Sequence, residues 1–191
     1  MVTSKPYVSR QLNALARIKR FISLKQRKLI YQSFVLSNFN FCPLVWHFCS
    51  VKSMRKMEKI QERALKFLLN DSMSSYASLL EKACMSTLFL GRLRLFAIEV
   101  FKCINGLNPG FMNTTFKQKQ NKYDFRDDCI VALPHFNSIM YGKKSFKYYG
   151  AHIWNHVPPH FKHAESVKGF KRCITTWEGP ICQCNMCQIL F

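Results

Sequence analysis

Residues 36–69 read LSNFNFCPLVWHFCSVKSMRKMEKIQERALKFLL, and this stretch decides the fold. At about 100° per residue, its second half separates into an apolar face and a basic face. The apolar face carries Met57, Ile60, Gln61, Ala64, Leu65 and Leu68. The opposite face carries Lys52, Arg55, Lys56, Lys59, Arg63 and Lys66. The spacing predicts an amphipathic helix over residues 53–69, with Ser53 as N-cap, a Glu62–Lys66 pair and an end at residues 70–72.

The first half of the stretch, residues 39–49, is dense in aromatic residues and cysteines, which indicates a buried core. Before it, residues 8–22 have helical spacing. Ser23 and Gln26 then form the sequence of a capping box, which opens a second helix that continues through Val35. Pro43 interrupts the helical pattern.

The helical pattern continues after residue 72. Ser74 or Ser75 is placed to cap a short helix, and Thr87 is placed to cap a long one that runs to residue 105. Gly106 follows at the position where a left-handed residue ends many helices. The predicted fold class is therefore mainly α: a helical bundle followed by a smaller, mostly helical C-terminal region.

The pattern becomes less regular beyond residue 116. Residues 117–128, KQKQNKYDFRDD, are polar and predict a linker, and residues 129–136 predict a short strand. Helices are predicted over residues 145–155 and 166–177, separated by Pro158-Pro159. The organisation expected is a basic helical bundle (1–70), continuing helices (71–116), the polar linker (117–128) and a C-terminal region with a cysteine cluster (129–191).

The charge of the chain is strongly one-sided. It holds 29 lysines and arginines against 10 aspartates and glutamates, a net charge of +19. Residues 1–70 contain 14 of the basic and 2 of the acidic side chains, so +12 of the excess lies there. Such asymmetry points to nucleic acid or an anionic membrane surface. No run of 18 apolar residues is present, so no membrane-spanning segment is expected.

The nine cysteines carry a prediction about compartment and metal binding. The N-terminal sequence MVTSKPYVSR lacks the apolar run of a signal peptide, so we expect an intracellular protein, nuclear or cytoplasmic, without disulfides. Cys182, Cys184 and Cys187 are close enough to bind one zinc ion, with Cys173 or a histidine as the fourth ligand that zinc requires. The favoured alternative is a tail of free thiols, because the ligand set is incomplete in sequence.

Two further groups of residues were considered as sites. Phe125 to Asp128 match the aromatic-x-Asp-Asp pattern of polymerases, and Asp71-x4-Tyr76 resembles its partner motif. We interpret both matches as coincidence, because Asp127 follows a lysine-rich polar run and Asp71 follows a helix end. The second group is a series of four histidines: His152, His156, His160 and His163. We expect capping or surface roles for them, because Pro158-Pro159 prevents all four from sharing one helix face.

Long segments of the chain resemble a known family. They are LNALARIKRFISLKQRKLIYQSFVLSNFNFCPLVWHFCS (12–50), MEKIQERALKFLLND (57–71), SSYASLLEKA (74–83), YGKKSFKYYGAHIWNHVP (141–158) and TTWEG-x2-CQC-x2-C (175–187). They are similar to the region downstream of the catalytic palm in non-LTR retrotransposon reverse transcriptases of the jockey and CR1-like kind. The resemblance covers nearly the whole chain.

The resemblance implies that residues 8–70 form the thumb of an RNA-directed DNA polymerase and residues 85–191 the part that follows it. In the family, the palm with its aromatic-Ala-Asp-Asp motif, its Mg²⁺ and an endonuclease domain lie N-terminal to this region. The resemblance therefore implies no catalytic residue here and no activity of the chain alone. It also implies that Cys182, Cys184 and Cys187 match the family's cysteine cluster, and that the chain is a fragment or a truncated element copy.

Three hypotheses follow. In the first, the chain holds an RNA template with a DNA primer or target, together with the remainder of the polymerase, through contacts to phosphates. The candidate backbone contacts are Arg17, Lys19, Arg20, Lys25, Arg27, Lys28, Lys52, Arg55, Lys56, Lys59, Arg63 and Lys66. In the second, the chain is itself a polymerase using Asp71, Asp127 and Asp128. In the third, it is a structural or zinc-dependent interaction protein whose basic face is plain solvent surface.

Overall fold

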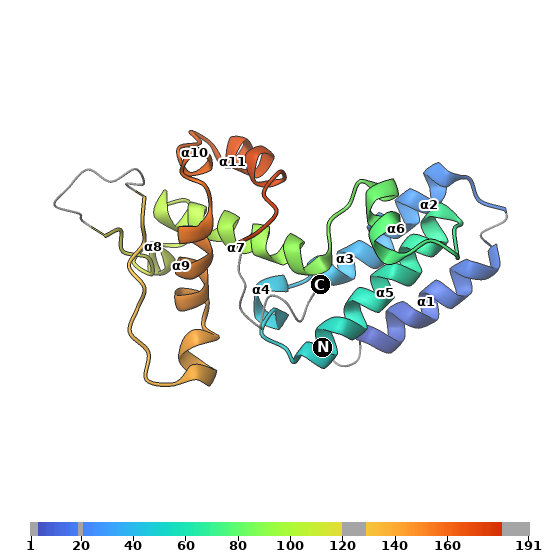
Figure 1. The fold of residues 1–191 in the computed structure, drawn as a ribbon, viewed down its shortest axis with the longest axis horizontal. Coiled ribbons are helices and arrows are strands. Elements are labelled where there is room, and N and C mark those ends of the chain that lie inside the picture. The colour runs from blue at the N-terminus through green and yellow to red at the C-terminus, as the bar shows by residue number, and fades with distance from the viewer. Residues whose placement is uncertain (1–3, 19–20, 120–128, 181–191) are drawn as a thin grey trace. The chain divides into compact units, whose positions relative to one another are not determined.

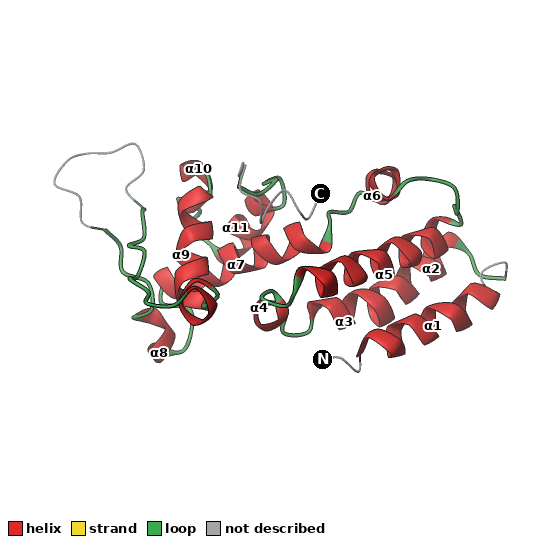
Figure 2. Ribbon diagram, turned by 60° about the horizontal axis from the view of Figure 1, so that its bottom comes forward, coloured by secondary structure: helices red, strands yellow, loops and turns green. Residues whose placement is uncertain are grey.

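The computed structural model is mainly helical, which confirms the predicted fold class (Figures 1 and 2). It describes residues 4–18, 21–119 and 129–180. These residues divide into two units, the first ending at Gly91 and the second beginning at Arg92. Among the described residues no helix is long and apolar enough to cross a membrane.

The first unit is built from short helices around one long one. Its elements are α1 (Ser4–Ile18), α2 (Leu24–Ile30), the π-helical segment η1 (Tyr31–Leu36), α3 (Ser37–Asn40), α4 (Pro43–Trp46), α5 (Val51–Leu69), α6 (Tyr76–Ala83) and the start of α7 (Leu88–Ile104). Helices α1, α2 and α6 all contact α5, and α1, α2 and α5 lie side by side in Figure 2. The central position of α5 follows from its broad apolar face, which needs cover from several neighbours.

The core of the first unit contains the apolar face predicted for α5. Met57, Ile60, Gln61, Ala64, Leu65 and Leu68 are all buried, as predicted. They pack with Leu12 of α1, Tyr31 and Val35 of η1, and Leu79 of α6. The caps predicted for α2 and α6 also form. Ser23 and Gln26 make the capping box of α2, and Ser75 caps α6.

Several boundaries differ from the prediction. Helix α1 covers Ser4–Ile18, and residues 21–22 form a turn before the extended N-cap Ser23, so the predicted continuation of the helix to residue 22 is wrong. Helix α5 begins after Ser50, whose hydroxyl accepts the N–H of Ser53, so the prediction of Ser53 as N-cap is wrong. The end of α5 is as predicted, with Asn70 in the left-handed conformation.

The aromatic stretch 39–49 is only partly buried. Phe39, Trp46 and His47 lie in the interior, as expected for a core segment. Phe41 and Val45 are 71% and 72% exposed. Helix α3 ends at Asn40, the extended Phe41 and the left-handed Cys42 follow, and Pro43 starts α4, so the helical pattern of buried positions is interrupted between Asn40 and Pro43.

The second unit is organised on α7. Its other elements are α8 (Gly110–Asn113), the π-helical segment η2 (Ile139–Lys143), α9 (Phe146–His156), α10 (Pro159–Lys162) and α11 (Val167–Ile174). Phe101 of α7 stacks on Phe170 of α11 at 4.4 Å between ring centroids, and Trp154 of α9 lies 5.9 Å from Phe170. As predicted, the hydroxyl of Thr87 accepts the N–H of Leu90 in the first turn of α7. Gly106 beyond its end has a φ of 67°.

The strand predicted over residues 129–136 is wrong. Within the described ranges, this segment makes an isolated antiparallel bridge between Val131 and Gln118. Its backbone is held largely by α9: the side chain of Asn155 donates to and accepts from Val131, and the indole of Trp154 donates to the carbonyl of Cys129. Side chains therefore satisfy backbone groups that a partner strand would otherwise bind.

Candidate nucleic-acid interface

The basic face of α5 lies on the solvent side of the first unit. Lys52, Arg55, Lys56, Lys59 and Arg63 are exposed, and Lys66 is half-buried. On a helical wheel these six cations fall within an arc of about 100°, opposite the buried residues. The arrangement is fixed locally, because the apolar face packs into the core and leaves the basic face no inward position.

The one polar residue predicted on the apolar face is fully accommodated. Gln61 is buried, and its Nε2 donates to the carbonyl oxygen of Ser86 at 3.3 Å. Its Oε1 lies 2.5 Å from the hydroxyl oxygen of Tyr76, whose single proton it shares with Glu58. Because both ends of the amide are hydrogen-bonded, Gln61 fits the core without an unpaired polar group.

The two carboxylates of residues 1–70 are both engaged within the protein. Glu62 pairs with Lys66 at 2.7 Å. Glu58 accepts three hydrogen bonds: from the hydroxyl of Tyr76 at 2.5 Å, and from the backbone N–H groups of Leu88 at 3.3 Å and Phe89 at 2.9 Å. Sequence reasoning missed this role of Glu58, whose partners lie 18 to 31 residues away.

Three lysines of the basic face carry no ion pair with any described residue: Lys52, Lys56 and Lys59. Arg63 donates from Nη2 to Oδ1 of Asn13 on α1 at 2.8 Å, which is a neutral partner. The charge of Lys52, Lys56, Lys59 and Arg63 is therefore not cancelled within the described part of the chain.

The contact between Arg63 and Asn13 extends the basic surface onto α1. Arg10 and Arg17 lie three residues before and four residues after Asn13, so all three share a face of that helix. Both arginines are exposed. Arg17 was predicted from the sequence, whereas Arg10 was missed. Its one signal was the i,i+7 spacing to Arg17.

The predicted cations of α2, the next helix along the chain, differ in exposure. Arg27 of α2 is half-buried, and its Nη1 donates to the carbonyl oxygen of Phe67 in the last turn of α5 at 3.2 Å. A guanidinium there complements the negative end of the helix dipole, which gives Arg27 a structural role. Lys25 and Lys28 are exposed on the same helix. Lys19 and Arg20 lie outside the described residues.

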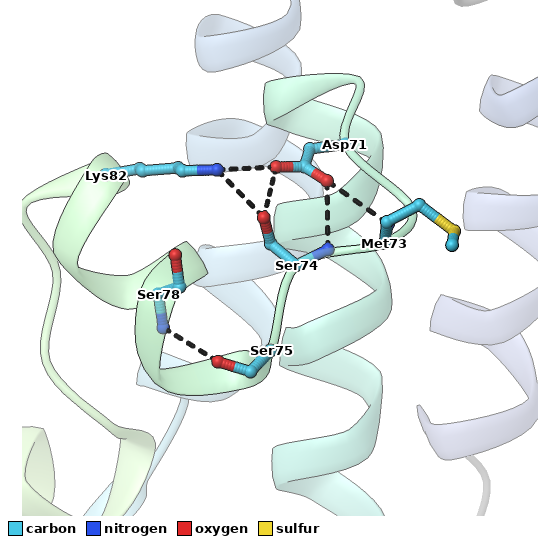
Figure 3. A network of polar contacts seen from close by, with 6 residues as sticks. All are labelled: Asp71, Met73, Ser74, Ser75, Ser78 and Lys82. Carbon is cyan, nitrogen blue, oxygen red and sulfur yellow. Dashed lines mark hydrogen bonds and ion pairs between the residues drawn. The ribbon is translucent and has the colours of Figure 1, made fainter.

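Asp71, the residue considered in the polymerase pattern, closes the loop between α5 and α6 (Figure 3). Its carboxylate accepts from Lys82 Nζ at 2.7 Å, from the hydroxyl and N–H of Ser74, and from the N–H of Met73. Lys82, followed by Ser74, holds the pKa of Asp71 well below its usual value. The pKa of Tyr76 is raised, first by burial and then by the nearby Glu58. Both residues of the match thus have partners within the fold.

The remaining predicted groups give no assembled metal site in the described ranges. No cluster of three histidine, cysteine, aspartate or glutamate side chains occurs among those residues. His152 and His156 do share a face of α9, with ring centroids 4.5 Å apart. Cys182, Cys184, Cys187, Asp127 and Asp128 lie outside the described residues. Among the described residues, six cysteines are free thiols: Cys42, Cys49, Cys84, Cys103, Cys129 and Cys173.

The chemistry available to this surface is electrostatic. A row of ammonium and guanidinium groups on one helix face can bind phosphates, and such contacts carry no information about base sequence. No protein-family model, curated protein or solved structure matches the chain.

Proposed function

We propose that the chain binds nucleic acid through its phosphate backbone, with the exposed face of α5 as the principal contact. The observation that supports this is the row of cations from Lys52 to Lys66, opposite a buried apolar face. Its ends are about 21 Å apart along the helix at 1.5 Å per residue. One strand of a duplex presents about six phosphates over that length, at about 3.4 Å each.

The resemblance to reverse transcriptases of non-LTR retrotransposons gives this binding a context. In that context the first unit is the thumb, and α5 grips an RNA template paired with a DNA primer. Binding, and not catalysis, is the role assigned to these residues. The phosphate contacts proposed on α5 and α1 are Arg10, Arg17, Lys52, Arg55, Lys56, Lys59 and Arg63.

The test is a fluorescence anisotropy titration with an RNA–DNA hybrid duplex at several salt concentrations. The variant Lys56→Glu, Lys59→Glu, Arg63→Glu changes three neighbouring cations of the face. Each phosphate contact contributes about −0.9 to the slope of log affinity against log salt, so the slope should become shallower by about 2.7. Between 50 and 200 mM salt, the parent should then lose roughly 40-fold more affinity than the variant.

A matched control separates the α5 face from overall charge. The variant Lys117→Glu, Lys119→Glu, Lys168→Glu changes three exposed lysines of the second unit. Each reversal removes two charges, so both triple variants carry +13 instead of +19. The control should keep most of the parent's affinity and slope. The proposal fails if the α5 variant binds the hybrid as tightly as the parent, or if both variants weaken binding equally.

A further inference from the structure

A row of aromatic rings follows α9 in the second unit. Phe136 lies 4.8 Å from Tyr148 between ring centroids, Tyr148 lies 6.4 Å from His152 with nearly parallel rings, and His152 lies 4.5 Å from His156. Tyr148, His152 and His156 recur every four residues, so they share one face of the helix. These four rings are called the aromatic row below.

The aromatic row is not part of the core. The buried face of α9 is the opposite one, formed by Gly150, Ala151, Ile153 and Trp154. Phe136, Tyr148 and His152 are half-buried, and His156 is exposed. Burial lowers the pKa of His152, with His156 and Lys143 adding to the effect, so its surroundings favour the uncharged ring.

The position of Phe136 at one end of the row is set by a glycine. A Cβ on Gly142 would come within 2.4 Å of the Cβ of Phe136, so only glycine leaves room for the ring there. Lys143, the next residue, lies over the Phe136 ring at 5.4 Å from Nζ to the centroid. Phe136 is therefore held in the row by close packing against η2 and by a cation–π contact.

The stretch of sequence that contains the aromatic row is basic and includes no acidic residue. Residues 129–164 include no aspartate or glutamate, whereas Lys143, which contacts Phe136, and Lys144 and Lys147, which follow it in sequence, are exposed. Tyr141, in η2, adds a further ring that is 84% exposed. Aromatic faces combined with cations and free of negative charge suit a ligand with flat rings and a phosphate backbone.

We propose that the aromatic row is a binding surface for single-stranded nucleic acid, in which unpaired bases stack on Tyr148 and His152 while the lysines contact phosphates. A duplex does not fit this use, because its bases are already stacked on one another. The surface lies on a different unit from α5, so it is independent of the function proposed above.

The experiment titrates the full chain into three fluorescently labelled probes and measures their anisotropy. The probes are a 20-nucleotide oligothymidine, an abasic strand of equal length and charge, and a 20-base-pair duplex. The parent should bind oligothymidine at least tenfold more tightly than the abasic strand, since each stacked base contributes substantially to affinity. The variant Tyr148→Leu, His152→Leu keeps apolar bulk and helix propensity but removes the rings. It should bind oligothymidine at least tenfold more weakly than the parent and the duplex unchanged.

The matched control is Tyr148→Phe, His152→Phe, which retains both rings and should keep the oligothymidine affinity. Photocrosslinking of the parent to a 4-thiouracil strand gives a readout that needs no folded variant, and the crosslinked peptide should lie within residues 136–156. The proposal is overturned if the parent binds the abasic strand as tightly as oligothymidine, if the leucine variant folds and binds within twofold of the parent, or if crosslinks map only outside those residues.

Discussion

The hydrogen bonds of Glu58 predict that this residue, and not its neighbour Glu62, determines the stability of the first unit. The change Glu58→Gln preserves the size of the side chain and removes its charge. An amide offers one oxygen, so it can keep the N–H of Phe89, while Tyr76 can turn its hydroxyl to accept from the new NH2 group. The N–H of Leu88 then faces a donor, and one hydrogen bond is lost.

The magnitude follows from these contacts. A hydrogen bond to a charged group contributes about 1.5–3 kcal/mol and a neutral one about 0.5–1.5 kcal/mol, and a charge at a helix N-terminus adds about 0.3–1 kcal/mol. Losing one bond, weakening the others and removing the charge near the start of α7 should therefore cost about 2–3 kcal/mol. In a domain of this size, that lowers the melting temperature by on the order of 10 °C.

The assay is urea and thermal unfolding followed by circular dichroism, with hydrogen exchange of the Leu88 and Phe89 amides as a local readout. The control is Glu62→Gln, which removes the same charge from the partly exposed pair with Lys66 and should cost less than about 0.5 kcal/mol. Equal destabilisation by the two substitutions would show that the hydrogen bonds of Glu58 do not hold α7 to α5, and the reasoning would be refuted.

Two further predictions concern packing and pH. Gly150→Ala should destabilise the second unit by about 1–3 kcal/mol, because the new Cβ would come within 2.9 Å of Phe116, whereas Gly91→Ala meets no atom within 4 Å and should be neutral or stabilising; equal melting temperatures for the two variants would contradict this. The carboxyl of Asp71 should titrate well below its usual value of 3.8 in an NMR experiment, and Lys82→Met should raise its midpoint. Since the depressed pKa belongs to the folded state, its stabilisation is present above about pH 4 and is lost as the pH falls below that range; a midpoint at the usual value in the parent would contradict the ion pair.

Helix positions and faces were predictable where burial repeats with the helical period. For α5, the spacing of six residues from Met57 to Leu68 was enough to predict their burial, because a single apolar face packs on one continuous core. Caps were predictable for the same local reason: Ser23 and Gln26 contact each other only three residues apart.

The features that were missed depend on contacts distant in sequence or on backbone geometry. Phe41 is exposed at a break between α3 and α4, where its own backbone is extended and Cys42 is left-handed, and cysteine has no preference for that conformation. The structural role of Arg27 depends on Phe67, which is 40 residues away. The aromatic row forms because the segment that contains Phe136 packs against Tyr148 of α9. In the sequence, it was indicated by the i,i+4 spacing of Tyr148, His152 and His156 alone.

In the folded first unit, the exposed face of α5 is more positively charged than the composition of this helix indicates. Residues 1–70 contain two carboxylates, and both lie on the helix that carries the basic face. Glu58 turns toward α6 and the start of α7, and Glu62 pairs with Lys66. Four exposed cations of α5, Lys52, Lys56, Lys59 and Arg63, therefore keep their charge among the described residues, although two glutamates lie on the same helix. A surface selected only for solubility has no need of this separation, whereas phosphate binding benefits from every uncompensated cation.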